Sequence, residues 1–300
     1  MNSGCENYLV SAIITTHNRL DLLPRAIDSV INQTYKNLEC IVVDDASSDG
    51  TLKYCQSRSD VVYIRISPED SKGGNHARNM GIKAAKGRYV AFLDDDDSWM
   101  TDKIRLQMEL VYRKQAKFVY CGRRIESVKS GNVTFKNDYP LQEFCGDMSG
   151  KILESICCVT STILVDKRLL QQVGCFDESL RFWQEYELTI RLAQVIPFYF
   201  VNDILIVYRV NPHDKNRRTN KYDEWIESVK YIHQKHKTLY KKANLVSKMR
   251  SEGLVYVDAF HRAKVSNLKY RASLNFLLSF ICLLIPRILK IPKYWNRFVK

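Results

Sequence analysis

The chain has 300 residues, of which 45% are hydrophobic and 26% are charged. This composition is typical of a globular protein and excludes general disorder, and the length suffices for one large α/β domain with a smaller appendage. The nine cysteines form an odd set without a C-x-x-C pair, which argues against a zinc site and against a disulfide framework.

The first third of the chain alternates between the patterns of buried strands and of amphipathic helices. Short apolar runs predict strands at 10–15, 38–43, 61–66 and 89–93. Apolar residues at helical spacing predict helices at 22–33, 75–86 and 103–114. This alternation predicts an α/β fold of the Rossmann-like kind, with a mostly parallel sheet and helices on both faces. Ligands of such sheets bind at the carboxyl ends of the strands, so we expect functional residues to follow the strands.

Beyond about residue 115 the pattern becomes mixed. Further strands are predicted at 118–121, 160–165 and 204–208, and further helices at 167–173 and 185–194. The stretch 209–222 is polar and charged, which is typical of a loop, and helical patterns continue from it toward the C-terminus. We therefore expect two domains, residues 1–210 and residues 211–300, the second of them helical and basic.

The net charge of +13 is concentrated in the last third of the chain. Residues 1–208 contain 25 basic and 27 acidic side chains, whereas residues 209–300 contain 21 basic and 6 acidic ones. A basic excess in one region favours a polyanionic partner or an anionic membrane surface, with a solvated basic tail as the alternative. No motif for binding RNA or DNA is present, so we expect no nucleic-acid partner.

The apolar run at 274–285 is shorter than the roughly 18–20 residues that a membrane-spanning helix needs. A proline and the basic, aromatic run RILKIPKYWNRFVK follow it. This arrangement favours a helix in the plane of a membrane surface, with a buried helix of the C-terminal domain as the alternative. The N-terminus lacks a basic segment followed by a long apolar stretch, so we predict no signal peptide and a reducing, cytoplasmic environment.

Polar side chains follow the first two predicted strands. Thr15, Asn18 and Arg19 come after the first strand, and Asp44 and Asp45 come after the second. Hydroxyl, amide and guanidinium groups can bond a base, a ribose or a phosphate, and a carboxylate can accept from a uracil N–H or a ribose hydroxyl. Helix caps use similar residues, but capping does not explain the adjacent carboxylates of Asp44 and Asp45.

Four consecutive carboxylates, residues 94–97, follow the fourth predicted strand. Like charges at the end of a buried strand raise one another's pKa and destabilise the fold unless a cation lies among them. Oxygen ligands suit Mg²⁺ or Mn²⁺, which typically keep waters and bind substrate phosphates as well. We therefore predict a metal site here, rather than a solvated acidic turn that caps the next helix.

Three further segments carry candidate site residues. Arg78 follows a Gly-Gly pair on a predicted helix and suits a phosphate. Glu185 and Glu187 begin another helix, where a carboxylate can act as a general base or can simply interact favourably with the helix dipole. His213 lies in a basic loop and can bind a metal or a diphosphate, although a lone loop histidine is more often a surface residue.

Four motifs in order, ITTHNR, VVDDASSDGT, GGNHARNMGI and YVAFLDDDDSWM, resemble those of the family 2 glycosyltransferases with the GT-A fold. The resemblance covers about residues 8–210. It implies that Glu185 is the general base, where the family usually has Asp, and that Asp96 coordinates Mn²⁺ or Mg²⁺ with His213 beside the donor diphosphate. The adjacent carboxylates leave the register of the D-x-D open by one residue. The implied nucleotide-sugar site consists of Thr15, Asn18, Arg19, Asp44, Asp45, Arg78, Asp94 and Asp95.

The family context implies an inverting displacement, in which a nucleotide-sugar donor, with UDP favoured, passes its sugar to an acceptor hydroxyl. The basic C-terminus suggests a glycan acceptor on polyprenyl diphosphate, as in bacterial O-antigen or capsule synthesis, and a peripheral position on the inner face of the cell membrane. The alternative function is a catalytically degenerate relative that binds anionic lipid. A sugar nucleotidyltransferase is disfavoured, because residues 10–19 lack a Gly-rich loop.

Overall fold

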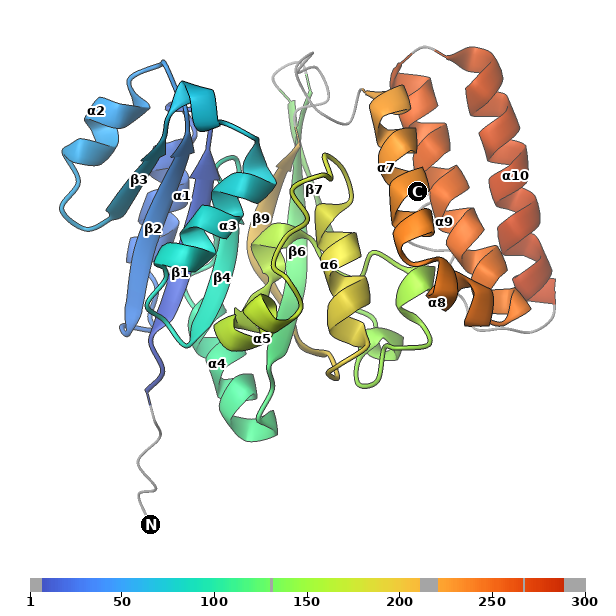
Figure 1. The fold of residues 1–300 in the computed structure, drawn as a ribbon, viewed down its shortest axis with the longest axis horizontal. Coiled ribbons are helices and arrows are strands. Elements are labelled where there is room, and N and C mark those ends of the chain that lie inside the picture. The colour runs from blue at the N-terminus through green and yellow to red at the C-terminus, as the bar shows by residue number, and fades with distance from the viewer. Residues whose placement is uncertain (1–6, 130–131, 211–220, 267, 289–300) are drawn as a thin grey trace. The chain divides into compact units, whose positions relative to one another are not determined.

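The computed structural model of the chain describes residues 7–129, 132–210, 221–266 and 268–288 (Figure 1). It divides into two compact units. The first comprises residues up to 213, except for the segments 149–156 and 180–183. The second comprises those two segments and the residues from 214 onward. Our expected boundary after residue 210 did not include the two short segments in the C-terminal part.

A nine-stranded sheet runs through the first unit (Figure 1). Its strands are β1 (Val10–Thr16), β2 (Leu38–Asp45), β3 (Val62–Ile66), β4 (Tyr89–Asp94), β5 (Ser98–Trp99), β6 (Phe118–Lys129), β7 (Asn132–Asp138), β8 (Leu164–Asp166) and β9 (Tyr199–Val210). They follow the order β3-β2-β1-β4-β8-β6-β9-β5, and β7 pairs with β6. The pairs among β1, β2, β3 and β4 are parallel, as is β6 with β9, whereas the other pairs are antiparallel.

Helices pack on this sheet and also build the second unit. The first unit contains α1 (Leu23–Ile31), α2 (Thr51–Gln56), α3 (Gly74–Ala84), α4 (Lys103–Lys114), α5 (Lys167–Gln172) and α6 (Gln184–Ala193). The second contains α7 (Tyr222–Lys235), α8 (Lys237–Lys242), α9 (Leu245–Val265) and α10 (Lys269–Ile288). Short 3₁₀ helices lie at Pro68–Asp70, Gln142–Phe144, Ile152–Glu154 and Thr160–Thr162.

Both faces of the sheet are covered because its central strands are apolar on both sides. Alternate residues of β1, namely Val10, Ala12 and Ile14, belong to a core that also contains the buried side chains of α1 and α4. The intervening Ile13 lies on the other face, close to Gly81 of α3. The two faces of β1 therefore pack against different helices.

The predicted α/β fold is confirmed, and its first half follows the predicted order closely. β1 to β4, α1, α3 and α4 lie at the predicted positions. The second half differs, because the sheet becomes mixed and residues 160–162 form a 3₁₀ turn where we predicted a strand. The side chain of Ser161 in this turn bonds the carboxylate of Asp97 and the backbone N–H of Asp94, and β8 begins only at Leu164.

The second unit is a helical bundle that the two short segments join. Glu154 accepts hydrogen bonds from Ser247 (2.5 Å) and from Arg250 (2.6 Å) near the start of α9. The indole N–H of Trp183 donates to Asp258 of α9 at 3.0 Å. These buried polar contacts explain why both segments belong to this unit although they precede it in sequence.

No helix within the described ranges is long and apolar enough to cross a membrane. The eight cysteines of the described ranges all carry free thiols. Most of the loop predicted at 209–222 lies outside the described residues, since residues 211–220 are not described.

Replacing Gly81 with alanine tests the close contact between α3 and β1. A Cβ at this position would lie 2.5 Å from Cγ2 of Ile13, so the helix would have to shift off the sheet. We expect Gly81→Ala to lower the free energy of unfolding by about 1–3 kcal/mol, measured by urea denaturation. Gly150→Ala is the control, because its Cβ meets no atom within 4 Å. Equal stability of the two variants would contradict this packing.

Candidate active site

The carboxyl ends of β1, β2 and β4 lie side by side at one edge of the sheet. In the strand register Thr16 is opposite Asp44, and Thr15 is opposite Asp94. Candidate residues that are far apart in the sequence, Thr15 included, therefore lie along one continuous edge. The loops that follow these strands decide which of their side chains are available to a ligand.

Asn18 and Asp44 hold the loop after β2. The side-chain oxygen of Asn18 accepts from the N–H of Ser48 at 2.7 Å, and Asn18 itself has a left-handed φ of 52°. Asp44 is fully buried. One of its oxygens accepts from the N–H of Ser47 at 2.8 Å and the other from the Tyr63 hydroxyl at 2.6 Å. The Asp44 oxygens are thus already engaged, and a role in nucleotide binding stays a prediction.

Asp45 differs from its neighbour because one of its oxygens is unused. The side chain is buried, and Oδ1 has no hydrogen-bond partner among the described residues. A buried acceptor without a partner costs about 1–3 kcal/mol. The backbone carbonyl of Asp45, in contrast, contacts His17 Nδ1 at 2.5 Å. A ligand that brings an N–H or O–H donor to Oδ1 would therefore be stabilised here.

The four carboxylates after β4, which we call the acid turn (residues 94–97), have different partners. Asp94 pairs with Arg78 of α3 at 2.7 Å. Asp95 and Asp96 share the guanidinium of Arg19, at 3.0 Å and 2.8 Å. Two of the arginines predicted to bind the donor thus neutralise the acid turn in the structure.

Asp97 belongs to the interior of the protein. It is fully buried and accepts hydrogen bonds from the Ser161 hydroxyl (2.6 Å) and from the backbone N–H of Arg209 (3.0 Å). The carbonyl of Ser161 also accepts from the indole N–H of Trp99 at 3.1 Å. We did not predict Ser161 or Arg209. A serine in an expected strand and a backbone N–H carry no motif that would have indicated these contacts.

Exposure alternates along the acid turn. The side chains of Asp94 and Asp96 are 31% and 32% exposed, whereas those of Asp95 and Asp97 are buried. Asp94 and Asp96 each use one carboxylate oxygen in their ion pair with an arginine. The two ends of an Asp94-x-Asp96 motif are thus the carboxylates that a solvent-borne ligand can reach.

Burial disfavours the ionised form of the carboxylates in the acid turn. It raises the pKa of Asp95 to about 6, although the positive charge of Arg19 acts in the opposite direction. Burial, together with the charge of Asp94, also raises the pKa of Asp96. Burial raises the pKa of Asp97 well above its usual range. Additional positive charge at this edge would therefore stabilise the ionised carboxylates.

The acid turn fits a metal that is shared with a substrate. Within the described residues, no three or more His, Cys, Asp or Glu side chains converge into a complete metal cage. Mg²⁺ and Mn²⁺ commonly bind through one or two carboxylates, completed by waters and substrate phosphates, and Asp94 and Asp96 offer two exposed carboxylates. The other predicted ligand, His213, lies outside the described residues.

The guanidinium of Arg78 is buried at the base of the site. Besides Asp94, it donates to the side-chain oxygen of Asn75 at 3.2 Å, and it lies 5.5 Å from the centre of the Phe176 ring. The following Asn79 donates to the carbonyl of Phe176 at 2.9 Å. Arg78 therefore reaches a ligand through its effect on Asp94 more readily than by direct contact.

The two glutamates that begin α6 have different environments. Glu187 is fully buried and pairs with Arg191 one turn later at 2.6 Å. Glu185 is not part of this ion pair. Burial raises the pKa of Glu185, while the charges of Arg78 and Asp94 act on it in opposite directions. Glu185 is therefore close enough to the acid turn for the charge of Asp94 to affect its pKa. Glu187 instead stabilises α6 through its ion pair with Arg191.

Comparison with known proteins identifies the family of the chain. Residues 11–173 match the family model described as Glycosyl transferase family 2. An uncharacterized glycosyltransferase of Rickettsia typhi is 34% identical over 231 residues, 75% of this chain and 71% of that protein. The UDP-Glc:alpha-D-GlcNAc-diphosphoundecaprenol beta-1,3-glucosyltransferase WfaP of Escherichia coli is 42% identical over 118 residues, 39% of this chain and 47% of that protein.

Solved structures show the same fold at low sequence identity. TarS 1–349 of S. aureus in complex with UDP-GlcNAc has a TM-score of 0.56 and 15% identity, covering 97% of this chain and 95% of that one. The mannosyltransferase PcManGT from Pyrobaculum calidifontis, in complex with GDP-Man and Mn²⁺, has a TM-score of 0.56 and 16% identity, covering 94% and 88%. Because the family match extends from β1 to α5 and includes the acid turn, the chain belongs to the family 2 glycosyltransferases.

Proposed function

We propose that this glycosyltransferase moves a sugar from a UDP-sugar to a hydroxyl of a lipid-linked glycan, with inversion at the anomeric carbon. The observation that carries the proposal is the arrangement of three carboxylates. Asp94 and Asp96 are exposed at the sheet edge, and Glu185 lies within electrostatic reach of Asp94. Two carboxylates for the donor and a separate one for the acceptor are what such a displacement requires.

The unused oxygen of Asp45 supports a uracil nucleotide as the donor's base. Oδ1 is buried and lacks a partner among the described residues, so it can accept from the uracil N–H. Thr15 lies on the neighbouring strand and opposite Asp94, where its hydroxyl can reach a ribose or a phosphate. Solved structures of TarS, which shares the fold, contain UDP and UDP-GlcNAc.

Asp94 and Asp96 are the residues that would hold a Mn²⁺ or Mg²⁺ ion. Such an ion would supply positive charge that stabilises the diphosphate as a leaving group. Arg19 is 39% exposed and now pairs with Asp95 and Asp96. The Arg19 guanidinium, which lies beside these carboxylates, would bind a phosphate oxygen of the donor. Asp97 keeps its buried hydrogen bonds throughout.

Glu185 would take the proton of the acceptor hydroxyl. As its carboxylate accepts that proton, the acceptor oxygen bonds to the anomeric carbon and the bond from that carbon to the diphosphate breaks. Burial raises the pKa of Glu185 toward neutral pH, and a carboxylate with a higher pKa is a stronger base. Glu187 cannot substitute, because it is fully buried and paired with Arg191.

The outward side of α10 supports an acceptor that is anchored in a membrane. The helix buries small or polar residues, Ala272, Asn275 and Ser279, against the second unit. Leu278, Leu283 and Leu284 are half-buried, and Leu283 lies close to Gly253 of α9, but six large apolar side chains of the helix are exposed. The exposed residues, which we call the apolar face, are Tyr270, Leu274, Phe276, Leu277, Phe280 and Ile281. A membrane surface would cover such a face.

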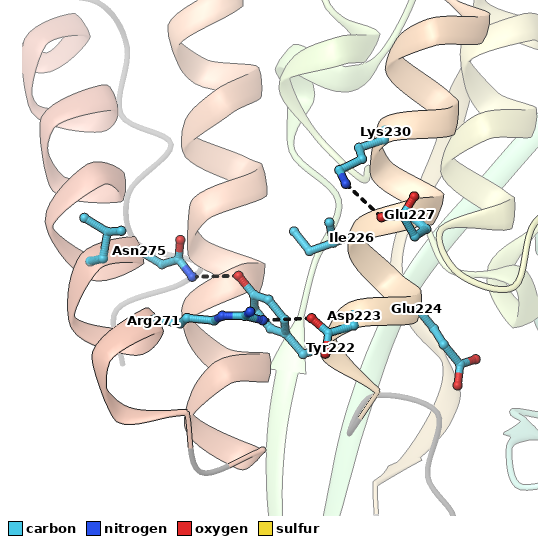
Figure 2. Close-up of a pocket in the computed structure, with 9 residues that line it drawn as sticks. Tyr222, Asp223, Glu224, Ile226, Glu227, Lys230, Arg271 and Asn275 are labelled. Atoms are coloured by element: carbon cyan, nitrogen blue, oxygen red, sulfur yellow. Dashed lines mark hydrogen bonds and ion pairs between the residues drawn. The ribbon is translucent and has the colours of Figure 1, made fainter.

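A groove of about 610 Å³ between α7 and α10 adjoins the apolar face (Figure 2). Arg271 pairs with Asp223 across it at 2.7 Å, and the amide of Asn275 donates to the Tyr222 hydroxyl at 3.1 Å. Leu274 of the apolar face also lines the groove. Charges of both signs beside apolar side chains match the headgroup layer of a bilayer. Two Escherichia coli relatives are named for acceptors on diphosphoundecaprenol.

Transfer by the purified chain tests the proposed reaction. We expect one UDP-sugar to be consumed in the presence of an N-acetylglucosaminyl diphosphate lipid and Mn²⁺ or Mg²⁺, and to remain intact with EDTA. Asp96→Ala should lower the rate at least about 100-fold, since it removes an exposed carboxylate of the acid turn. Asp28→Ala, at a side chain of α1 that is 56% exposed, is the control. Transfer that persists at full rate in EDTA would refute the metal requirement.

The pH dependence of transfer tests the role of Glu185. The base must be ionised, so log kcat should rise with pH through the raised pKa of Glu185 and then level off. Glu185→Gln should lower kcat roughly 100- to 10,000-fold, leave UDP binding within threefold of wild type, and abolish the acidic limb of the profile. Glu185→Asp, the residue usual in the family, should retain that limb. A Gln variant with an unchanged acidic limb would assign that limb to another group, such as a carboxylate of the acid turn, and would contradict the role of Glu185.

Flotation of the full chain with lipid vesicles tests the apolar face. We expect the chain to float with phosphatidylcholine vesicles that contain phosphatidylglycerol, because both apolar contact and the basic C-terminal third favour binding. Leu277→Asp combined with Phe280→Asp should reduce the bound fraction about tenfold or more. Val195→Asp, at an exposed position of the first unit, should not reduce it. Equal flotation of both variants would exclude this face as the contact.

A further inference from the structure

A second group of charges lies against the acid turn and has no part in the function proposed so far. Arg25 of α1 and Arg209 of β9 approach the same carboxylate oxygen of Glu126 on β6. The distances from that oxygen are 3.9 Å to Arg25 Nη1 and 3.5 Å to Arg209 Nε. Three elements that are distant in sequence thus bring two guanidinium groups and one carboxylate together.

Both arginines are also tied to the acid turn. Arg25 Nη2 donates to the backbone carbonyl of Asp96 at 2.8 Å, and the backbone N–H of Arg209 donates to Asp97 at 3.0 Å. These bonds fix the two residues beside the segment that carries Asp94 and Asp96. An anion held by the arginines would therefore lie next to the carboxylates that we assign to the metal.

The charges of this group do not balance. Two guanidinium groups share one carboxylate, and their contacts with it exceed the 2.7–2.9 Å of a strong charge-assisted hydrogen bond. The side chains of Arg25 and Arg209 are 38% and 33% exposed. Each guanidinium has five N–H donors, so most of their donors are left for a ligand or solvent.

The contacts of Glu126 differ from the shortest ion pairs of the chain. The ion pair of Glu187 with Arg191 and that of Glu154 with Arg250 both measure 2.6 Å, and their carboxylates are buried. Both pairs are shorter than either contact of Glu126, whereas the pair of Arg65 with the buried Asp44 measures 3.3 Å. The long contacts and the exposure of Arg25 and Arg209 are compatible with guanidinium groups that can bind an anion from solvent.

We propose that Arg25 and Arg209 form a subsite that binds a diphosphate. The ligand class follows from the planar guanidinium forks, which match phosphate oxygens in pairs. The diphosphate belongs either to the nucleotide or to a lipid-linked acceptor, and this choice rests on the function proposed above. Glu126 keeps the two guanidinium groups close together, and its negative charge neutralises only one of their two positive charges.

Binding of inorganic pyrophosphate in the absence of metal tests the subsite without relying on transfer. We expect calorimetry to show binding by the full chain and a Kd at least tenfold higher for the double variant Arg25→Gln with Arg209→Gln. Arg105→Gln, at an exposed ion pair of α4, is the control and should bind as wild type does. The Arg209 backbone bond to Asp97 does not depend on its side chain, and thermal denaturation checks that the variants are folded.

Two further measurements identify the source of the diphosphate. If it is the nucleotide's, the double variant should bind UDP at least tenfold more weakly, while its KM for the acceptor stays unchanged. If it is the acceptor's, UDP binding should stay unchanged, and KM should rise for a diphosphate-lipid acceptor but not for a phosphate-free glycoside. Pyrophosphate binding that is equal in wild type and double variant, or absent from wild type, overturns the subsite. Lack of transfer with intact pyrophosphate binding overturns only the proposed function.

Discussion

The constraint on which the site depends is the accumulation of four carboxylates at the end of a buried strand. Burial raises the pKa of three of them. Four ionised carboxylates so close together would repel one another and destabilise the fold if none had a partner. The chain treats them unequally instead. Asp97 is turned inward onto the uncharged donors of Ser161 and the Arg209 backbone, and arginines neutralise the other three. This inequality leaves Asp94 and Asp96 partly exposed, and thus leaves them for chemistry.

The change of the sheet from parallel to mixed places hydrogen-bond donors beside Asp97. β8 runs antiparallel to β4, with Leu164 opposite Ala91, so the residues just before β8 lie beside the end of β4. Ser161 can therefore reach Asp97. β5 and β9 are antiparallel as well, which places the end of β9 and its Arg209 against the acid turn.

The sequence predicted those parts of the structure in which one local pattern determines the outcome. Apolar runs located β1 to β4, because β1, β2 and β4 are buried on both faces and β3 is a short apolar strand beside them. Helical spacing located α1, α3 and α4, because one face of each helix is buried. The extension of β6 beyond residue 121 and the start of β9 at Tyr199 were not predicted, since these stretches are strands through their pairing and no continuous apolar run marks them. For the site, the sequence indicated the acid turn and Glu185. It contained no local signal for Ser161, for the commitment of Asp44 to its loop, or for Arg25 beside Asp96.

The two units of the chain differ in their charge and in the apolar surface that they expose. The first carries nearly equal numbers of acidic and basic side chains, and the candidate site is assembled from arginines and carboxylates that contact one another. The second carries the basic excess of the chain and exposes the apolar face of α10. For an acceptor anchored in a bilayer, these properties complement each other. An enzyme bound to the same surface as its acceptor meets it at a high local concentration, so the site itself needs little affinity for the lipid. The diphosphate that links glycan to lipid is then the part of the acceptor that an exposed pair of arginines is best suited to recognise.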